Sequence, residues 1–226
     1  MTRHRGAEFG IVETRVQGRA RHARLVEWRE RVAAEKRAAF ASEAYWGRPV
    51  PSLGDVDASV LIVGPAPAAH GANRTGRMFT GDRSGDWLFA ALHRAGYASQ
   101  ASSVAADDGL TLTGVRITAT CHCAPPANKP TPAEIRQCNG HLKAELAAMP
   151  RLRVIVALGA IAHQALLRAY GLKPGAHAFG HNVSHALPDG RLLVDSYHCS
   201  GYNWRTGRLS RESFEAVFDE VNARLG

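Results

Sequence analysis

The sequence has no apolar run that approaches the roughly 20 residues needed to cross a bilayer. Its polar N-terminal residues are not followed by the apolar stretch of a signal peptide. Cysteine is rare, with four in 226 residues, and the spacing of these cysteines matches no zinc ribbon or zinc finger. These absences argue against a membrane-spanning segment, an export signal and a zinc finger. We therefore expect a cytoplasmic protein whose cysteines are not paired as disulfides.

Lysine is also scarce, because only four of the 28 basic residues are lysine. With 20 acidic residues, the formal net charge is +8. Arginine-rich composition favours recognition of planar anions such as phosphates. A genome rich in G and C would produce the same ratio of arginine to lysine, although not the net charge. Both explanations stay open, and the charge alone is weak evidence for nucleic-acid binding.

The length of 226 residues suits one domain with a short extension. Apolar residues make up 45% of the chain and charged residues 21%, which indicates a packed core rather than a disordered chain. The N-terminal residues are polar and lack a helical or strand pattern. We predict an extension over residues 1–22 and a single domain over residues 23–226.

Short apolar segments rich in β-branched residues alternate with helical patterns along this domain. Strands are expected at residues 60–64, 115–118, 154–159 and 192–194, and helices at 23–42, 84–95, 160–170, from a capping box at Thr131 and from a cap at Ser210. This alternation predicts an α/β fold with a central parallel sheet of about four strands flanked by helices. Ligands of such sheets bind beyond the carboxyl ends of the strands.

Two segments that follow predicted strands, residues 64–82 and 197–209, are unusually polar for connections. Each combines glycines with arginines, histidine and aromatic rings. Glycine lets backbone N–H groups approach a ligand closely, while arginine and aromatic rings suit a ligand that is both anionic and flat. A nucleotide fits that description. Neither segment matches the P-loop or the dinucleotide-binding fingerprint, which argues against a mononucleotide-cofactor enzyme.

Four segments resemble one known family. They are the segment at residues 64–82, Tyr-Trp-Gly-Arg-Pro-Val-Pro at 45–51, Cys-Ala-Pro-Pro-Ala-Asn-Lys-Pro-Thr-Pro at 123–132 and His-x-Ser-x-x-Asn-x-x-Thr-Gly-Arg-Leu at 198–209. In this order they are similar to the family 5 (type B) uracil-DNA glycosylases of bacteria and archaea. The resemblance runs from about residue 25 to the C-terminus. It implies a uracil-DNA glycosylase superfamily-like α/β domain that flips uracil out of DNA and hydrolyses its N-glycosidic bond.

The resemblance implies a role for several of these side chains. Phe79 is expected to stack on the flipped base, and His198 to donate a hydrogen bond to the base carbonyl as the base leaves with negative charge. Tyr202 or Trp204 is expected to fill the vacated stack, although either ring could simply pack the loop. Further base contacts are expected from Gly64, Ala66, Pro67, Ala119 and Asn128, and further DNA contacts from Arg74, Arg77, Ser200, Asn203, Arg205 and Arg208.

The sequence departs from related glycosylases at the position of the water-activating group. Better-known families place a carboxylate in the first motif, where this chain has Pro65 and Ala66. His70 and Asn73 are the polar side chains left to hold a water molecule, with Asn73 preferred. Asp82 is expected to cap a helix or to orient another group.

A second departure lies ahead of Cys123. Members of the family commonly carry there an asparagine that reads the base edge, whereas this chain has Thr-Ala-Thr at residues 118–120. Loss of that amide should relax discrimination between bases. Other deaminated bases such as hypoxanthine or xanthine are therefore plausible substrates.

A third departure concerns metal binding. The family usually holds a [4Fe-4S] cluster with four cysteines, of which Cys123 and Cys138 are the counterparts here. The other two positions carry Arg19 and His22. Two thiolates and a histidine are a poor ligand set for such a cluster, although Cys121 and Cys199 could in principle substitute for the missing ligands. We therefore expect no cofactor, with Cys123 and Cys138 as remnants of a cluster site and Cys138 as a small core residue.

Two further functions stay open at this point. One is a protein that binds uracil-containing or abasic DNA and turns over poorly, which the missing carboxylate and Cys199 in the last motif keep open. The other is an α/β enzyme that acts on free nucleosides. The main expectation is a monomeric glycosylase whose partner is single- and double-stranded DNA, with no membrane partner.

Overall fold

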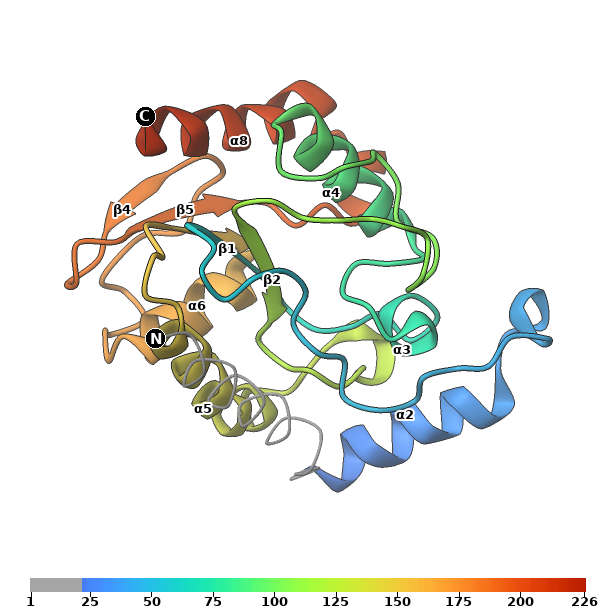
Figure 1. Ribbon diagram of the computed structural model, residues 1–226. Helices are drawn as coiled ribbons and strands as arrows, with labels where there is room; N and C mark the ends of the chain where they lie inside the picture. The colour runs from blue at the N-terminus through green and yellow to red at the C-terminus, as the bar shows by residue number, and fades with distance from the viewer. Residues whose placement is uncertain (1–21) are drawn as a thin grey trace, which may run out of the picture.

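The computed structural model describes residues 22–226, and a five-stranded sheet lies at its centre (Figure 1). The strands are β1 (Val60–Gly64), β2 (Val115–Ala119), β3 (Val154–Leu158), β4 (Ser184–Ala186) and β5 (Leu192–Ser196). Their order is β2-β1-β3-β5-β4. All neighbours pair parallel except β4, which pairs antiparallel with β5 at one edge. The predicted α/β fold and its four strands are thus confirmed.

The fifth strand, β4, has no counterpart among the predicted strands. It consists of Ser-His-Ala and is half-buried or exposed, so it carries no apolar pattern. It forms a hairpin with β5, and Leu187 N donates to Arg191 O across the turn at 2.9 Å. The Pro-Asp-Gly sequence in that turn is a typical turn signal, and it could have indicated the hairpin.

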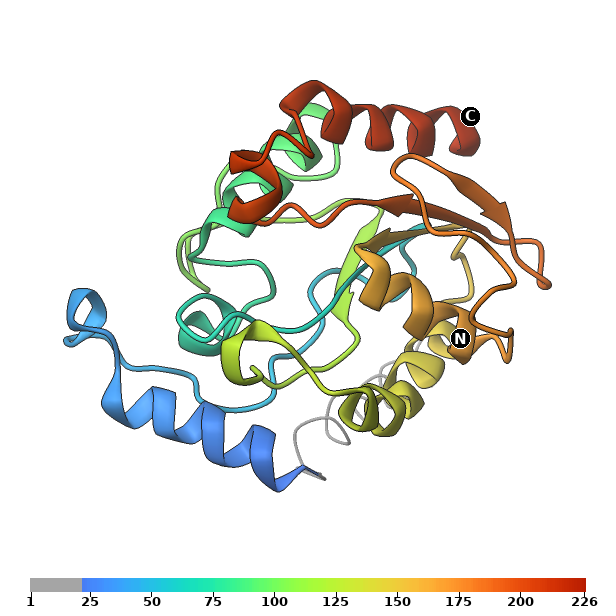
Figure 2. The same ribbon diagram turned by 180° about the vertical axis from the view of Figure 1, so that it is seen from behind.

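Helices cover both faces of the sheet, as Figures 1 and 2 show. Alternate side chains of β1 point to opposite faces: Val60 and Ile62 pack in one core with α4 (Arg83–Arg94) and α8 (Arg211–Leu225). Leu61 and Val63 pack in the other core with α5 (Pro132–Ala148) and α6 (Ala160–Ala169). Every residue of β1 is buried. The sheet is therefore a tightly packed support for the loops that follow its strands.

The remaining helices are short or peripheral. They are α2 (Ala23–Glu35), η1 (Ala38–Phe40), α3 (Ala72–Thr75), η2 (Pro126–Asn128) and α7 (Gly201–Arg205). The helix expected over residues 23–42 ends early, because the backbone of Lys36 turns to a left-handed φ of 55°. Side-chain caps at Thr131 and Ser210 are present as predicted.

The carboxyl ends of β1, β2, β3 and β5 lie at one edge of the sheet. The chain runs from β1 to β2 on one side and then to β3 on the other, which makes a topological switch point where ligands commonly bind. Both polar segments singled out in the sequence leave strands at this edge. No helix within residues 22–226 is long and apolar enough to cross a bilayer.

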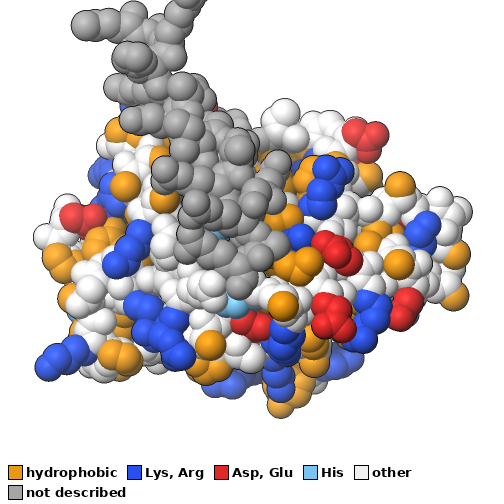
Figure 3. Space-filling model, turned by 90° about the horizontal axis from the view of Figure 1, so that it is seen from below, with side chains coloured by type: hydrophobic (Ala, Val, Ile, Leu, Met, Phe, Trp, Pro, Cys, Tyr) orange, Lys and Arg blue, Asp and Glu red, His pale blue; other side chains and the backbone are white. Residues whose placement is uncertain are grey.

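The net positive charge is not gathered on the face shown in Figure 3. On the visible atoms of that face, basic and acidic side chains are interspersed. Because this face carries no concentrated positive charge, the role of each arginine in the loops has to be judged from its own burial and partners.

The predicted extension over residues 1–22 lies, apart from His22, outside the described residues.

Candidate active site

A cavity of about 370 Å³ opens where the loops from three strands meet. Its walls come from residues 65–68 after β1, from Phe79 and Asp82, from Ala119 at the end of β2, from residues 127–129, and from His198, Ser200 and Tyr202 after β5. Of the six expected base contacts, Ala66, Pro67, Phe79, Ala119 and Asn128 lie in this lining, and Gly64 does not. We refer to it as the base pocket.

Phe79, in the wall of the base pocket, has an energetically unfavourable backbone conformation. Its φ is 53°, a left-handed value that is costly for a residue with a side chain. A Cβ on Gly64 would lie 2.7 Å from the Phe79 ring, and a Cβ on Gly85 would lie 1.8 Å from the Phe79 carbonyl oxygen. Gly64 therefore supports the ring from behind. Both glycines are required by the close approach of Phe79.

His198 faces the same cavity from the loop that follows β5. Its ring centroid lies 6.1 Å from that of Phe79, with the planes tilted by 30°. Its backbone carbonyl accepts from Asn203 Nδ2 at 2.8 Å and from Ser200 N at 2.8 Å. Burial lowers the pKa of His198 to about 4. The ring is therefore neutral near pH 7 and offers one N–H to a ligand.

Asp82 is a carboxylate in the wall of the base pocket, although its sequence context predicted only a cap or an orienting group. Its Oδ1 accepts from Ser84 N at 2.8 Å and Gly85 N at 3.1 Å, so it does cap α4. Burial raises its pKa, against the lowering effect of these two hydrogen bonds. Both contacts use Oδ1. The second oxygen, Oδ2, can accept a further hydrogen bond, for example from water.

Asn128 enters the pocket from a sharply turned segment. Ala127 and Asn128 both have left-handed φ values, 53° and 55°. Asn128 N donates to Pro125 O at 3.1 Å, which fixes the turn. The side chain lines the base pocket and the two cavities beside it. Asn128 is thus part of the wall of the base pocket, and its amide carries both a donor and an acceptor.

Asn73 and His70, the two residues expected to hold water, do not line the base pocket. The side chain of Asn73 is fully buried, and its Nδ2 donates to Arg29 O at 3.3 Å and Ala69 O at 3.4 Å. It joins α3 to α2 and cannot reach a ligand. His70 Nδ1 lies 3.0 Å from Tyr45 Oη and faces a neighbouring open groove. The structure therefore does not bring either predicted water-holding residue into the base pocket, because the loop directs both side chains elsewhere.

The prediction that Arg74 and Arg77 contact phosphates does not fit the structure either. They are only 8% and 7% exposed. Arg74 pairs with Glu43, donates to His70 O at 2.8 Å and Gly81 O at 3.1 Å, and lies 3.9 Å from the centroid of the Phe40 ring. Its guanidinium therefore ties the loop together.

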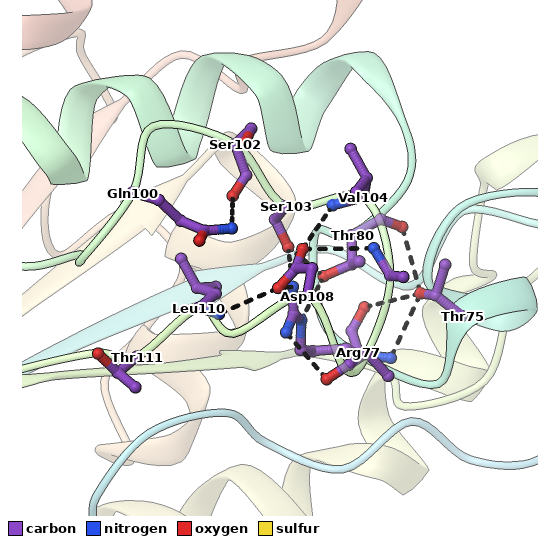
Figure 4. A network of polar contacts seen from close by, with 12 residues as sticks. Thr75, Arg77, Thr80, Gln100, Ser102, Ser103, Val104, Asp108, Leu110 and Thr111 are labelled. Atoms are coloured by element: carbon purple, nitrogen blue, oxygen red, sulfur yellow. Dashed lines mark hydrogen bonds and ion pairs between the residues drawn. The ribbon is translucent and has the colours of Figure 1, made fainter.

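Arg77 is the centre of a buried polar network, shown in Figure 4. It donates to Asp108 Oδ1 at 2.7 Å, Ser103 Oγ at 2.7 Å and Thr80 Oγ1 at 3.0 Å. Burial alone would raise the pKa of Asp108, but hydrogen bonds from Arg77 and from three backbone N–H groups lower it to about 2. The network attaches the segment before β2 to the residues on either side of Phe79.

In the segment after β5, unlike the segment after β1, several of the singled-out side chains are exposed. Tyr202 is 64% exposed beside the pocket, and Arg205 and Arg208 are exposed. Trp204 instead stacks on Trp87, with centroids 3.6 Å apart and planes at 14°. Of the two candidate wedges, Tyr202 is thus the one with an exposed ring. The ring of Trp204 packs the loop against α4.

Comparison with known proteins places this site in a family. A model of the uracil DNA glycosylase superfamily matches residues 51–225. The chain is 52% identical over 203 residues to a type-5 uracil-DNA glycosylase of Thermus thermophilus, which covers 90% of this chain and 92% of that protein. Matches named in the same way are 50% identical in Mycobacterium leprae, over 90% of each chain, and 45% identical in Pyrobaculum aerophilum, over 92% and 89%.

The chain belongs to the type-5 uracil-DNA glycosylases. The family resemblance of the four motifs is thereby confirmed. The matched region of the superfamily model contains the whole base pocket, because it runs from before β1 to the end of α8.

Of the four cysteines that the resemblance implies for a four-iron cluster, this type-5 chain carries two, Cys123 and Cys138, which is too small a thiolate set for that cluster. Cys123 Sγ accepts a hydrogen bond from Arg29 Nη1 at 2.9 Å. Burial raises the pKa of this thiol, and the contact with Arg29 lowers it by less. A hydrogen bond to Cys138, with burial, raises the pKa of the Cys121 thiol. Cys199 lies elsewhere, with its Sγ 3.4 Å from Ser84 O. Arg19 is outside the described residues.

A cluster of His163, His185 and Asp195 is the one group within residues 22–226 with the composition and closeness of a metal site. Both carboxylate oxygens are already engaged: Oδ1 lies 2.8 Å from His163 Nδ1, and Oδ2 lies 3.1 Å from His185 Nε2. His163 Nε2 also lies 3.1 Å from His177 O. These contacts account for the polar atoms of Asp195 without a metal.

Proposed function

We propose that this chain is a monofunctional uracil-DNA glycosylase that flips uracil out of DNA and hydrolyses its N-glycosidic bond to leave an abasic site. The observation that carries the proposal is the base pocket of a type-5 family member, which brings Phe79, His198, Asp82 and Asn128 into one cavity. A flipped base needs an aromatic surface, a partner for its edge and a donor at its carbonyl oxygen. This pocket offers all three.

His198 is suited to stabilise the departing base. When the bond between N1 and C1′ breaks, both electrons go to uracil, and negative charge spreads to its O2 atom. A neutral imidazole N–H aimed at that oxygen strengthens its hydrogen bond as the charge develops. Burial lowers the pKa of His198 and keeps it neutral, so the ring carries no positive charge before the reaction. Hydrogen bonds from Asn203 and Ser200 to its backbone carbonyl fix the backbone from which the ring extends.

Asp82 is the better candidate for holding the attacking water, in place of Asn73 and His70. The water oxygen forms the new bond to C1′, and one water proton must leave. A carboxylate in the pocket wall can accept that proton through Oδ2 and can balance the positive charge on the sugar. The cap contacts from Ser84 and Gly85 to Oδ1 fix its direction.

The range of bases is proposed to extend beyond uracil to hypoxanthine and xanthine. Residues 118–120 provide no asparagine, and the wall after β1 consists of small apolar side chains, Pro65 to Ala68. Asn128 then provides the amide for the base edge from a different loop. An amide can turn to present either its donor or its acceptor, so one residue can pair with several bases.

The enzyme is further proposed to act on single- and double-stranded DNA, to work as a cytoplasmic monomer and to need no cofactor. The ligand set supports the last point, because Arg19 and His22 stand at two of the four cysteine positions of the cluster. The free cysteines support a reducing compartment.

The decisive assay uses a labelled oligonucleotide with a single uracil, as a single strand and opposite guanine. Strand cleavage only after alkali, and only with uracil present, is the expected result. An oligonucleotide with thymine at the same position and the His198→Ala variant serve as controls. A shifted but uncleaved band would indicate a binding protein instead, and neither effect would favour an enzyme of free nucleosides.

A further inference from the structure

A second cavity, of about 520 Å³, lies outside the base pocket between α4, α7 and the first residue of α8. It is lined by Arg83, Asp86, Trp87, Trp204, Arg205 and Arg211, among others. We call it the tryptophan groove. We propose that it binds the phosphodiester backbone of the DNA strand beside the flipped nucleotide, an inference that rests on the proposed function.

The floor of the groove is rigid and aromatic. Trp87 and Trp204 stack at 3.6 Å, and the Trp204 ring meets Phe214 edge to face at 6.3 Å. Within residues 22–226, the buried Nε1 of Trp204 has no hydrogen-bond acceptor. A DNA strand in the groove would therefore rest against a flat and closely packed aromatic surface.

The rim of the groove is basic and exposed. Arg83, Arg205 and Arg211 are all exposed, and Asp86 is the one carboxylate among the residues that line the groove. Arg211 also reaches Glu215 at 3.1 Å, as an exposed pair one helical turn apart. Such a pair is weak enough to be exchanged for a phosphate. The rim of the tryptophan groove therefore carries more guanidinium groups than carboxylates.

Two of these arginines occupy positions that helix electrostatics disfavour. Arg83 is the first residue of α4 and Arg211 the first residue of α8. The N-terminus of a helix carries partial positive charge, so a basic side chain there destabilises the helix. Because α4 and α8 both begin with an arginine that lines the tryptophan groove, the positive electrostatic potentials of the two helix N-termini and of the two arginines add there. Together with the groove itself, this arrangement favours a polyanion as the occupant.

The groove continues directly from the base pocket. Ser84 and Tyr202 line the base pocket, while their chain neighbours Arg83 and Gly201 line the groove. A Cβ on Gly201 would lie 3.9 Å from the Arg83 side chain, so the two segments meet. A strand whose nucleotide enters the base pocket must leave past this point. Phosphates that flank the flipped nucleotide are thus the natural occupants.

The test compares two charge-matched double variants. Arg83→Gln with Arg211→Gln alters the groove, whereas Arg151→Gln with Arg168→Gln removes two exposed arginines at the opposite edge of the sheet. The affinity of each protein for a duplex with an abasic-site analogue is measured against salt concentration. The groove variant should flatten the log–log slope by about 1.8, at about 0.9 for each phosphate that the protein no longer neutralises. The control should keep the slope of the parent protein.

The rate of uracil excision at saturating enzyme separates the two claims. It is measured for the parent protein and for the Arg151→Gln, Arg168→Gln control, which should excise uracil at the same rate because neither arginine lines the base pocket or the tryptophan groove. Equal slopes in both variants, with excision intact, would overturn the groove and leave the proposed function standing. Failure of the parent protein to excise uracil would overturn both.

Discussion

The segments that follow β1 and β5 have similar compositions but put their arginines to opposite uses. After β1, Arg74 and Arg77 are buried and hold the loop together through Glu43, Asp108 and backbone carbonyls. After β5, Arg205 and Arg208 are exposed near the cavities. One segment therefore forms a wall of the base pocket held by buried arginines, and the other leaves its arginines exposed, where we propose that they meet DNA. Burial, rather than residue type, separates the two roles.

The largest expected effect comes from His198, where the two segments meet at the base pocket. His198→Ala should slow single-turnover excision of uracil by about two to three orders of magnitude, the scale of losing one donor to a developing oxyanion. Affinity for abasic DNA should change little, as measured by gel shift. Rates close to those of the parent protein would remove His198 from the mechanism.

The difference between the two kinds of arginine can be tested through stability. Arg77→Ala leaves Asp108 buried without its cation, which should lower the free energy of unfolding by about 3 kcal/mol. Arg208→Ala should change it by less than about 0.5 kcal/mol. Urea unfolding followed by circular dichroism measures both. Equal losses would mean that the two segments do not differ in the way described.

Tyr202 and Trp204 allow the same contrast between aromatic rings. Tyr202→Ala should slow excision from duplex DNA by about tenfold and spare single strands, in which no stack has to be opened. Tyr202→Phe keeps the ring and is the matched control. Trp204→Ala should instead destabilise the fold by about 2 kcal/mol through loss of its packing on Trp87. A duplex-specific defect in the Trp204 variant would reverse the assignments.

The smallest effect concerns pH. A folded-state pKa of about 4 for His198, against 6.5 for a free histidine, keeps the ring neutral, so the ratio of parent to His198→Gln excision rates should stay constant between about pH 5.5 and 8. Because the unfolded chain binds the proton first, this histidine costs stability as pH falls from about 6.5 to 4. His198→Gln should lack that loss in pH-dependent unfolding. A rate ratio that titrates near 6.5 would contradict a neutral donor.

Much of the fold followed from periodicity, and the motifs led to the right family. The four parallel strands were evident because apolar and β-branched residues dominate each of them, whereas β4 is too short and too polar to show a pattern. The caps at Thr131 and Ser210 were local signals and therefore reliable.

The site was harder to predict because it depends on where each side chain points. The residue types of Asn73 and Arg77 suggested a functional role. In the structure, both side chains point inward, because Asn73 donates a hydrogen bond to the backbone of Arg29 and Arg77 pairs with Asp108, and both partners are distant in sequence. Asp82 was expected only to cap or to orient, although a capping carboxylate keeps a second oxygen that can face a cavity. The stack of Trp204 on Trp87 joins residues far apart in the chain, which no local pattern reveals.

The most direct test of the mechanism compares two leaving groups. 5-Fluorouracil leaves more readily as an anion than uracil, so it depends less on a donor at its carbonyl oxygen. If His198 stabilises the departing base, His198→Ala should slow excision of uracil much more than excision of 5-fluorouracil in the same sequence, by about tenfold or more. An equal loss on both bases would contradict the account, because His198 would then only position the substrate.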